Sequence, residues 1–326
     1  MIIKKPAPRN KTIQITGEDF ENFEKKIIHL DKNISFDNLI NKTINQDLFD
    51  AIEFLPDSFI DLLFIDPPYN MNKKFGASKF KESSVEDYTD WLDNLISKLN
   101  RCIKPTASIY ICGDWKSSTS IHQVMEKYFV VRNRITWERE KGRGAKTNWK
   151  MNSEDIWFGT KSKEYFYNPD AVKLKRKVIA PYRTNSGIPK DWDDTESGQF
   201  RLTFPSNLWN DISVPFWSMS ENTEHPTQKP EKLLAKIILA SSKKGDLVFD
   251  PFLGSGTTSV VAKKLDRNFV GVELDKNFAI TCEKRLTMVD DNNNIQGYHD
   301  GVFWERNSTN LQKNNHKIND SDLKLL

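Results

Sequence analysis

Residues 66–69, Asp-Pro-Pro-Tyr, place an acid and an aromatic ring at the end of an apolar run. The run, residues 60–65 (IDLLFI), has the composition of a buried strand, and proline can end a strand because it has no N–H for the ladder. Each proline fixes its own φ, and the second also restricts the first. The pattern therefore predicts a stiff turn that holds the Asp66 carboxylate and the Tyr69 ring at a set spacing.

Residues 247–258 (LVFDPFLGSGTT) form a second motif, in which an apolar strand ends in Asp250 and a glycine-rich turn leads into a helix. Glycines at such a turn let a ligand approach the backbone closely. Glu273, seventeen residues past Gly256, ends the next apolar run, where an acid typically binds ribose hydroxyls. Together these features predict a nucleoside-like cofactor, although the glycines alone would also suit an ordinary strand-to-helix turn.

Two other uses of these glycines are disfavoured. A P-loop requires a lysine after the glycines, and none follows here. A dinucleotide fingerprint requires a third glycine, where this chain has Ser259. A cofactor without a pyrophosphate, such as S-adenosylmethionine, remains compatible with the motif.

The net charge of +3 is unevenly distributed along the 326 residues. Residues 139–190 hold thirteen Lys/Arg against five Asp/Glu, a local charge of +8. This concentration indicates a polyanion such as DNA or RNA, with a solvated basic loop as the equal alternative. The three cysteines and five histidines are scattered, which argues against zinc, metal catalysis and disulfides and suits a reducing cytosol. No apolar run could cross a bilayer, and the first ten residues lack a signal-peptide pattern.

Strand and helix patterns alternate on both sides of a polar middle segment, which predicts parallel strands joined by crossovers. We expect strands near 42–46, 60–65, 107–112, 129–137, 246–250 and 268–273. We expect helices over 20–30, 47–55, 85–102, 117–127, 228–242, 257–265 and 275–288. The predicted organisation is an N-terminal arm (1–33), a catalytic half (34–137), an inserted region without long helices (138–224), a cofactor-binding half (225–288) and a loose C-terminal tail (289–326) in which 301–307 could dock.

Three motifs in family order, DPPY at 66–69, HPTQKP at 225–230 and DPFLGSGTT at 250–258, resemble the amino-methylating DNA methyltransferases. Enzymes of that family transfer a methyl group from S-adenosylmethionine to N6 of adenine or N4 of cytosine. The motif order resembles the circularly permuted β group, and the resemblance covers roughly residues 42–288. It implies an α/β, Rossmann-like methyltransferase fold with a mostly parallel sheet, helices on both faces and an inserted target-recognition region over 138–224.

The resemblance also implies a mechanism for residues 66–69. The Asp66 carboxylate and the Pro67 carbonyl would accept hydrogen bonds from the amine, Pro68 would stiffen the turn, and Tyr69 would stack on a base flipped out of the duplex. Methyl transfer would be one direct displacement, and none of the cysteines follows a proline as carbon-5 cytosine methylation requires. DPPY favours adenine as the target, while N4-cytosine enzymes more often have Ser at the position of Asp66.

The resemblance also implies which residues bind the cofactor and the DNA. The cofactor residues implied are Asp47, Asp66, Thr227, Lys229, Asp250, Phe252, Gly254, Ser255, Gly256, Thr257 and Glu273. Asp47 is the weakest of them, because Gln46 stands where the family often has glycine. The DNA-binding residues expected in the basic segment are Lys141, Arg143, Lys146, Trp149, Lys150, Lys173, Lys175, Arg176, Lys177 and Arg183.

These motifs predict an enzyme that acts on double-stranded DNA in a prokaryotic or phage-infected cytoplasm. A cognate restriction endonuclease and a homodimer are further expectations from the family. A non-catalytic DNA-binding module with a methyltransferase fold is the alternative from a different class. The chain retains the motif residues Asp66, Tyr69, Asp250 and Glu273, which argues against a module that has lost its catalytic function.

Overall fold

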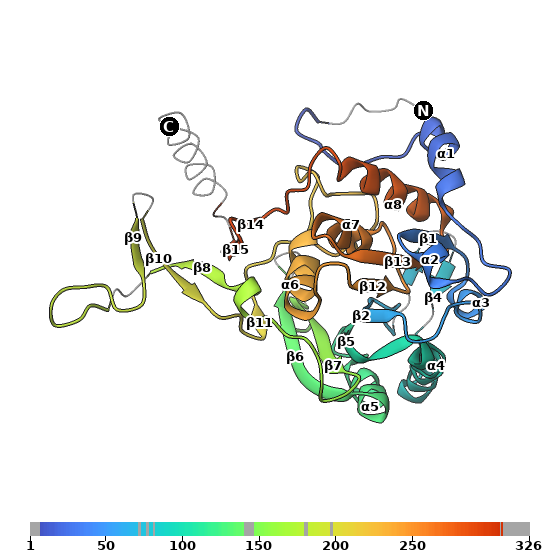
Figure 1. Cartoon of the computed structure of the whole chain (residues 1–326), viewed down its shortest axis with the longest axis horizontal. Helices are drawn as coiled ribbons and strands as arrows, with labels where there is room; N and C mark the ends of the chain where they lie inside the picture. Colours follow the sequence, from blue (N-terminus) through green and yellow to red (C-terminus); the bar gives the residue numbers. More distant parts are fainter. Residues whose placement is uncertain are drawn as a thin grey trace.

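A computed structural model describes residues 7–70, 73–75, 78–80, 82–139, 147–178, 182–195, 198–306 and 308. Within these residues the body of the protein is built on one large sheet with the strand order β1-β13-β12-β2-β5-β7-β6-β11 (Figure 1). Its strands are β1 (Lys42–Asn45), β13 (Asn268–Glu273), β12 (Leu247–Asp250), β2 (Ile60–Ile65), β5 (Ile103–Gly113), β7 (Ser153–Thr160), β6 (Val130–Glu138) and β11 (Leu208–Trp209). All neighbouring pairs are parallel except β5–β7 and β7–β6.

Helices cover both faces of this sheet. They are α1 (Gly17–Phe23), α2 (Phe36–Leu39), α3 (Leu48–Ile52), α4 (Val85–Leu99), α5 (Ser118–Tyr128), α6 (Glu231–Ser241), α7 (Thr257–Lys264) and α8 (Lys276–Met288), with 3-10 turns η1 (Glu24–Lys26), η2 (Asn100–Cys102) and η3 (Asp170–Val172). Alternate residues of β2 face opposite sides. Leu62 and Phe64 pack in the core that holds α6 and α7, and Leu63 packs in the core that holds α3, α4 and α5. The predicted fold class, α/β with a mostly parallel sheet, is confirmed.

The antiparallel strand β7 determines what lies at the functional edge of the sheet. Strands β12, β13, β2 and β5 end at this edge, and β7 begins there because it runs the opposite way. The predicted alternation of strand and helix stops at residue 138, yet β7 belongs to the central sheet. Strand β6 connects to its antiparallel neighbour β7 through residues 139–152, and antiparallel neighbours need no crossover helix, so the alternation stops while the sheet continues.

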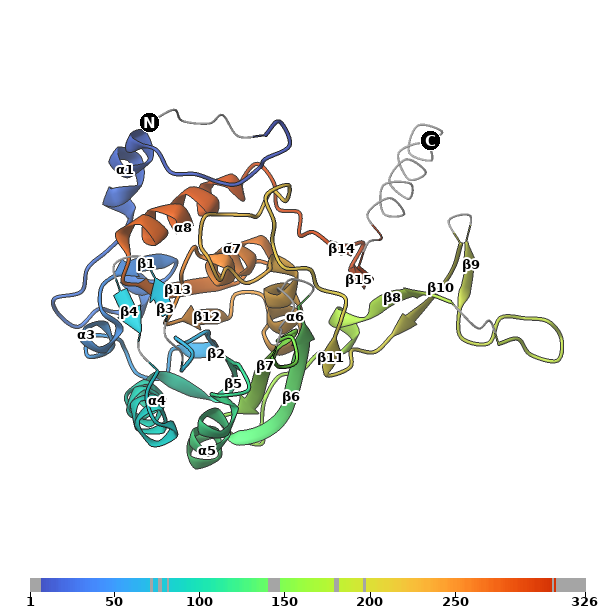
Figure 2. The same cartoon turned by 180° about the vertical axis from the view of Figure 1, so that it is seen from behind.

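A second sheet extends away from the body, with the order β14-β15-β8-β10-β9 (Figures 1 and 2). Its strands are β8 (Leu174–Lys177), β9 (Asp193–Thr195), β10 (Gly198–Thr203), β14 (Tyr298–His299) and β15 (Val302–Trp304). A further hairpin consists of β3 (Lys73–Phe75) and β4 (Ser78–Phe80). The inserted region therefore contributes strands to both large sheets.

The C-terminal segment is not loose over its described part. Strand β15 pairs with β8, and Trp304 is buried against Phe200 and Lys175. The Lys232 ammonium of α6 donates to the carbonyls of Asp211 and Trp304 at 2.7 and 2.5 Å. The expectation of a free tail from residue 289 is wrong for this stretch, and the docking expected of residues 301–307 is confirmed through Arg306. Buried aromatic rings explain the docking, because they remove apolar area from water.

The N-terminal arm is also attached. Helix α1 begins earlier than expected, because Thr16 caps it and accepts from the Asp19 N–H. Asp19 in turn pairs with Lys284 of α8 at 2.9 Å. The predicted helix over 20–30 is wrong beyond residue 26, where Ile28 instead bridges to Ile44 beside β1. None of the described helices is long and apolar enough to span a bilayer.

Candidate active site

A cavity of about 410 Å³ opens at the edge where β2, β12 and β13 end. Its volume lies in the range of small-molecule sites. Residues predicted for the site that line it are Asp47, Asp66, Pro67, Pro68, Tyr69, Thr227, Lys229, Phe252, Gly254 and Glu273. The fold thus brings the motif at residues 66–69 together with the motifs at 225–230 and 250–258, which lie more than 150 residues later in the chain. Ligands of open α/β sheets bind at this kind of edge.

Asp66 lies at the centre of a network of ionised and phenolic side chains. Its Oδ2 atom accepts from the Lys229 ammonium at 2.6 Å, and its Oδ1 atom accepts from the Tyr69 hydroxyl at 3.1 Å. Lys229 also donates to the Tyr69 oxygen at 3.3 Å. A carboxylate oxygen has two lone pairs, so Asp66 retains acceptor capacity for a further donor in the cavity.

Glu154 and Arg139 complete this network, and neither was predicted from the sequence. Glu154 Oε2 lies 3.2 Å from the Tyr69 hydroxyl and 3.3 Å from Lys229 Nζ, and Arg139 donates to Glu154 Oε1 at 2.5 Å. Glu154 is the second residue of β7, and Arg139 follows the last residue of β6. Only the antiparallel pairing of these strands brings both residues to the edge where Asp66 lies. The sequence signal available was an acid at the start of an apolar run, which is common on surfaces.

Burial and the two cations shift the pKa values of this network in different directions. Burial raises the pKa of Asp66, and the Glu154 charge adds to this, while Lys229 opposes it. For Glu154 the positive charges of Lys229 and Arg139 outweigh burial and lower its pKa. Burial beside two carboxylates raises the pKa of Tyr69. The two carboxylates also raise the pKa of Lys229, which remains an ammonium.

The Asp-Pro-Pro-Tyr turn is held by two contacts from the following chain. The Tyr88 hydroxyl of α4 donates to the Pro68 carbonyl at 3.1 Å. The Asn70 side chain donates to the Ser83 carbonyl at 2.9 Å and accepts from the Ser83 N–H at 2.8 Å. The ring of Tyr69 packs against the core that contains α6 and α7. Contacts at Pro68 and at the two residues after it thus stiffen the turn that carries Asp66.

The glycine motif holds its acids by different means. Asp250 accepts from the Thr258 hydroxyl at 2.5 Å and the Phe252 N–H at 2.9 Å. Glu273 accepts from the N–H groups of Gly254 and Asp275 at 2.8 and 2.7 Å. Burial raises the pKa of Asp250 and of Glu273 to about 7, and the hydrogen bonds that each accepts oppose this rise. Neither acid pairs with a cation in the part of the chain that the structure describes.

Two glycines are required by the turn itself. Gly254 and Gly256 have φ of 55° and 83°, a region that favours glycine. A Cβ on Gly256 would lie 2.3 Å from the Cys282 sulfur of α8. Ser255 and Thr257 face Arg285, whose guanidinium donates to the Ser255 carbonyl and the Thr257 hydroxyl. Asp47 lines the cavity and caps α3 by accepting from the Phe49 N–H at 2.8 Å.

The predicted DNA-binding residues fall into three groups. Lys141, Arg143 and Lys146 lie outside the described residues. Trp149 is 93% exposed, and Lys150 is also exposed, in the loop that joins β6 to β7 at the cavity edge. The others, Lys173, Lys175, Arg176, Lys177 and Arg183, lie in or near the outer sheet.

Several cations of the outer sheet have contacts within the chain. Lys173 pairs with Asp170 at 2.7 Å, and Arg176 lies 3.5 Å from Glu305. Lys175 lies over the Trp304 ring at 4.5 Å, and Arg183 over the Trp192 ring at 4.7 Å. The run KLKRK is therefore partly a packing element of the outer sheet rather than a plain row of solvated cations.

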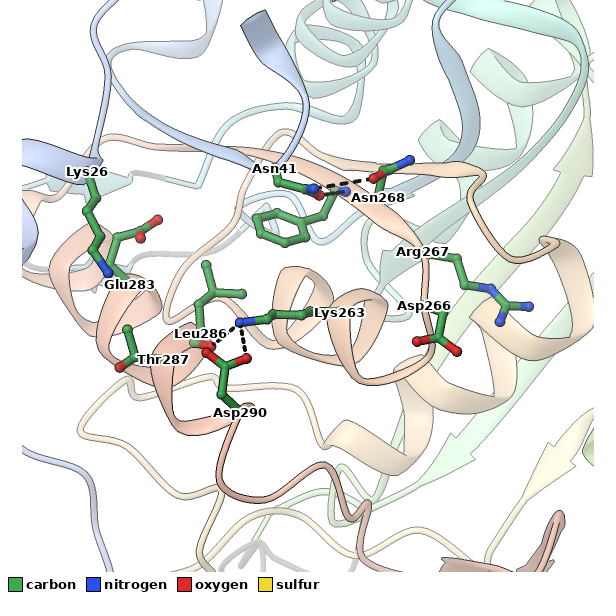
Figure 3. A pocket seen from close by; sticks show the side chains of 11 residues that line it. Lys26, Asn41, Lys263, Asp266, Arg267, Asn268, Glu283, Leu286, Thr287 and Asp290 are labelled. Carbon is green, nitrogen blue, oxygen red and sulfur yellow. Dashed lines mark hydrogen bonds and ion pairs between the residues drawn. The ribbon is translucent and has the colours of Figure 1, made fainter. Parts of the chain in front are cut away.

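A second hollow, of about 480 Å³, lies at the opposite edge of the sheet (Figure 3). It is lined by Asn268, where β13 begins, and by Lys263 and Asp290, which pair at 2.8 Å. Charges of both signs surround it, including the cations Lys26, Lys263 and Arg267. The sequence motifs converge on the first cavity instead.

The fold and the cavity define a Rossmann-like methyltransferase. The family model described as DNA methylase matches residues 60–284, and the chain belongs to this N6/N4 DNA methylase family. It is 34% identical over 259 residues to the DNA adenine methyltransferase YhdJ of Escherichia coli (strain K12), which covers 77% of this chain and 84% of that protein. It is 31% identical over 265 residues to the type II methyltransferase M.BglII of Bacillus subtilis, covering 78% of this chain and 71% of that protein.

Solved structures share the fold. The PvuII DNA methyltransferase, described as cytosine-N4-specific, aligns with a TM-score of 0.55 at 17% identity and covers 77% of this chain and 92% of that chain. The M1.HpyAVI–SAM complex aligns with a TM-score of 0.51 at 24% identity and covers 75% of this chain and 98% of that chain. The predicted methyltransferase fold is confirmed, and S-adenosylmethionine is the cofactor of this class.

Proposed function

We propose that this protein is a site-specific DNA adenine-N6 methyltransferase. The observation that carries the proposal is Asp66, held by a stiff Pro-Pro turn in the cavity that Glu273 and the glycine loop also line. The acid of the Asp-Pro-Pro-Tyr motif favours adenine, and the relative described as DNA adenine methyltransferase YhdJ supports this choice.

The residues of the cavity fit the cofactor. Glu273 would accept from the ribose hydroxyls, and the backbone of the glycine loop would lie against the methionine part. Asp47, Phe252, Thr227 and Lys229 line the same cavity. S-adenosylmethionine, when bound, supplies an electrophilic methyl group on a sulfonium.

Asp66 performs the central task of the chemistry. An exocyclic amine is a poor nucleophile because its lone pair is delocalised into the ring. Asp66 and the Pro67 carbonyl would accept from the amine hydrogens and favour a more tetrahedral nitrogen. The bound cofactor would supply the methyl group and keep its sulfur as a neutral thioether, and Asp66 would take the proton that the amine gives up and pass it to solvent. Fixed geometry supplies most of the acceleration in such a displacement.

Recognition of DNA would fall to the inserted region. The loop between β6 and β7 leaves the sheet at the cavity edge and presents Trp149 and Lys150 to solvent. Cations there suit phosphate, and an exposed indole suits stacking or wedging beside a flipped base. Exchanging residues 138–224 for those of a relative should change the methylated sequence and leave the chemistry intact. An unchanged target would refute this assignment.

The proposed function is tested by incubating the protein with S-adenosylmethionine and duplex DNA of mixed sequence, and then analysing the nucleosides by mass spectrometry. N6-methyladenine is the expected product. N4-methylcytosine would retain the mechanism and refute the choice of base. Cofactor binding without DNA methylation would refute the DNA substrate and favour the non-catalytic alternative.

We further propose a role in restriction–modification, in a bacterial cytoplasm, since relatives are described as type II methyltransferases. Plasmid DNA from cells that express the protein should then resist an endonuclease that cuts the methylated site. A homodimer is a further expectation from the family, and sedimentation of the pure protein tests it.

A further inference from the structure

The network around Asp66 contains a buried carboxylate, Glu154, to which the proposed mechanism gives no role. Glu154 is buried, with 8% of its side chain exposed, and it lines the cavity. Burying a carboxylate costs free energy unless it is paired and hydrogen-bonded, and here both oxygens are engaged. Oε1 accepts from Arg139, and Oε2 lies within reach of Tyr69 and Lys229.

Counting donors shows what Glu154 does for its neighbours. The Lys229 ammonium has three protons and three acceptors within reach, on Asp66, Glu154 and Tyr69. The Tyr69 phenol has one proton and two carboxylates within reach. Without the Glu154 carboxylate, both donors would be drawn to Asp66. Asp66 would then have less capacity to accept from an incoming amine.

The position of Glu154 also connects the network to the DNA-facing loop. Arg139 and Glu154 stand at the two ends of the β6–β7 connection, and the Arg139 N–H donates to the Asn152 carbonyl at 2.8 Å. Trp149 and Lys150 lie in this connection. The base of the proposed DNA loop therefore contains Glu154, which contacts Lys229 and Tyr69, and Arg139, which pairs with Glu154.

We propose that Glu154 is a positioning residue for methyl transfer, which holds Lys229 and Tyr69 partly away from Asp66 and is itself fixed by Arg139 at the root of the β6–β7 loop. The inference rests on the proposed function. In this proposal Glu154 does not contact the reacting atoms. It acts on methyl transfer through its contacts to Lys229 and Tyr69, which in turn contact Asp66. Misplacement of about 1 Å in such a site can slow catalysis about a hundredfold.

The test compares Glu154→Gln, Glu154→Asp and the double variant Arg139→Met/Glu154→Gln with Glu126→Gln as control. Glu126 lies on α5, with 62% of its side chain exposed. For each protein the readouts are kcat and KM for duplex DNA, the Kd of S-adenosylmethionine and the melting temperature. Active protein is counted by the stoichiometry of cofactor binding, so that a poorly folded variant is not mistaken for a slow one.

We expect Glu154→Gln to lower kcat about a hundredfold, with the cofactor Kd changed by less than about threefold. Glu154→Asp keeps the charge but shortens the side chain, and it should also lower kcat. The double variant restores the net charge of the cluster without restoring the contact to Lys229, so it should remain slow. The control should behave as the wild-type protein.

Two results would overturn the inference. One is a wild-type kcat in Glu154→Gln with correctly counted active protein. The other is recovery of kcat in the double variant, which would mean that Glu154 only balances the charge of Arg139. If the wild-type protein itself methylates no DNA, the proposed function fails instead, so the two failures are distinguishable.

Discussion

The two halves of the cavity hold buried carboxylates in different ways. On the cofactor side, backbone N–H groups and a hydroxyl hold Glu273, which lines the cavity, and Asp250, which is buried at the glycine turn outside the cavity lining. In the catalytic half, the long side chains of Lys229, Arg139 and Tyr69 hold Asp66 and Glu154. Backbone donors are fixed by the turn, whereas the catalytic network depends on side chains that come from distant parts of the chain.

This difference indicates two separable tasks. Among the described residues no cation pairs with Glu273, so a ligand that brings hydroxyl donors into the cavity would satisfy this acid. The catalytic half is neutral as a set, with two carboxylates against two cations. A cofactor-side change should therefore act on cofactor affinity, and a change at Asp66 should act on turnover.

The largest effect is expected from Asp66→Ala. Loss of the acceptor should lower kcat by about 10³-fold, as removal of one electrostatic stabiliser typically does. The Kd of S-adenosylmethionine should change by less than about tenfold, since most of the cavity is retained. Single-turnover methylation measures the rate of methyl transfer, and equilibrium binding measures the Kd of S-adenosylmethionine.

The matched control is Asp93→Ala, because Asp93 is an α4 residue that pairs with Lys127 on the surface. This control should leave the methylation rate and the cofactor Kd unchanged. Full turnover in Asp66→Ala would refute the role of the motif.

The next effect is expected from Glu273→Ala. Hydrogen bonds to a charged group contribute about 1.5–3 kcal/mol, so cofactor Kd should rise about 10- to 100-fold. Turnover at saturating cofactor should stay near the wild-type value. Isothermal titration measures the affinity, and an unchanged Kd would mean that Glu273 serves only the fold.

A pH series provides the third prediction. Asp250 and Glu273 have pKa values of about 7 when folded, above those of the unfolded chain. They bind protons more tightly in the folded protein, so the cofactor-free protein should lose stability as pH rises through about 7. Cofactor affinity should rise about tenfold between pH 6 and 8 through Glu273, which lines the cavity and accepts from the ligand in its ionised form. Thermal melts with and without S-adenosylmethionine measure both trends, and parallel curves would contradict the prediction.

The smallest effect is expected from Lys150→Ala in the β6–β7 loop. Loss of one phosphate contact should reduce the slope of log affinity against log salt by about 0.9. Cofactor Kd and kcat should not change, since Lys150 is exposed outside the cavity. DNA binding measured at several salt concentrations tests this. A change in cofactor affinity would mean that the loop and the cofactor half are not independent.

Much of the fold was predictable because it depends on local patterns. The apolar runs that form β2, β12 and β13 each end in an acid, and their neighbouring helices have clear apolar faces. The carboxyl ends of parallel strands meet at one edge, which is why Asp66 and Glu273 line the same cavity.

The features that the sequence did not predict depend on long-range pairing. Glu154 reaches the cavity only because β7 runs antiparallel to β5, and no local pattern sets that direction. Trp304 docks only because β8 offers an open edge more than 120 residues earlier. The predicted helix over 20–30 has good spacing, but the pairing of Ile28 with Ile44 overrides that local preference.

The most direct test of the separation between the two halves is single-turnover methylation of duplex DNA by Asp66→Ala and Glu273→Ala over a range of S-adenosylmethionine concentrations. At saturating cofactor, Glu273→Ala should recover a rate near that of the wild-type protein, while Asp66→Ala should remain about 10³-fold slower at every concentration. If both variants recover at saturation, or if both remain slow, the cavity works as one unit and the separation is wrong.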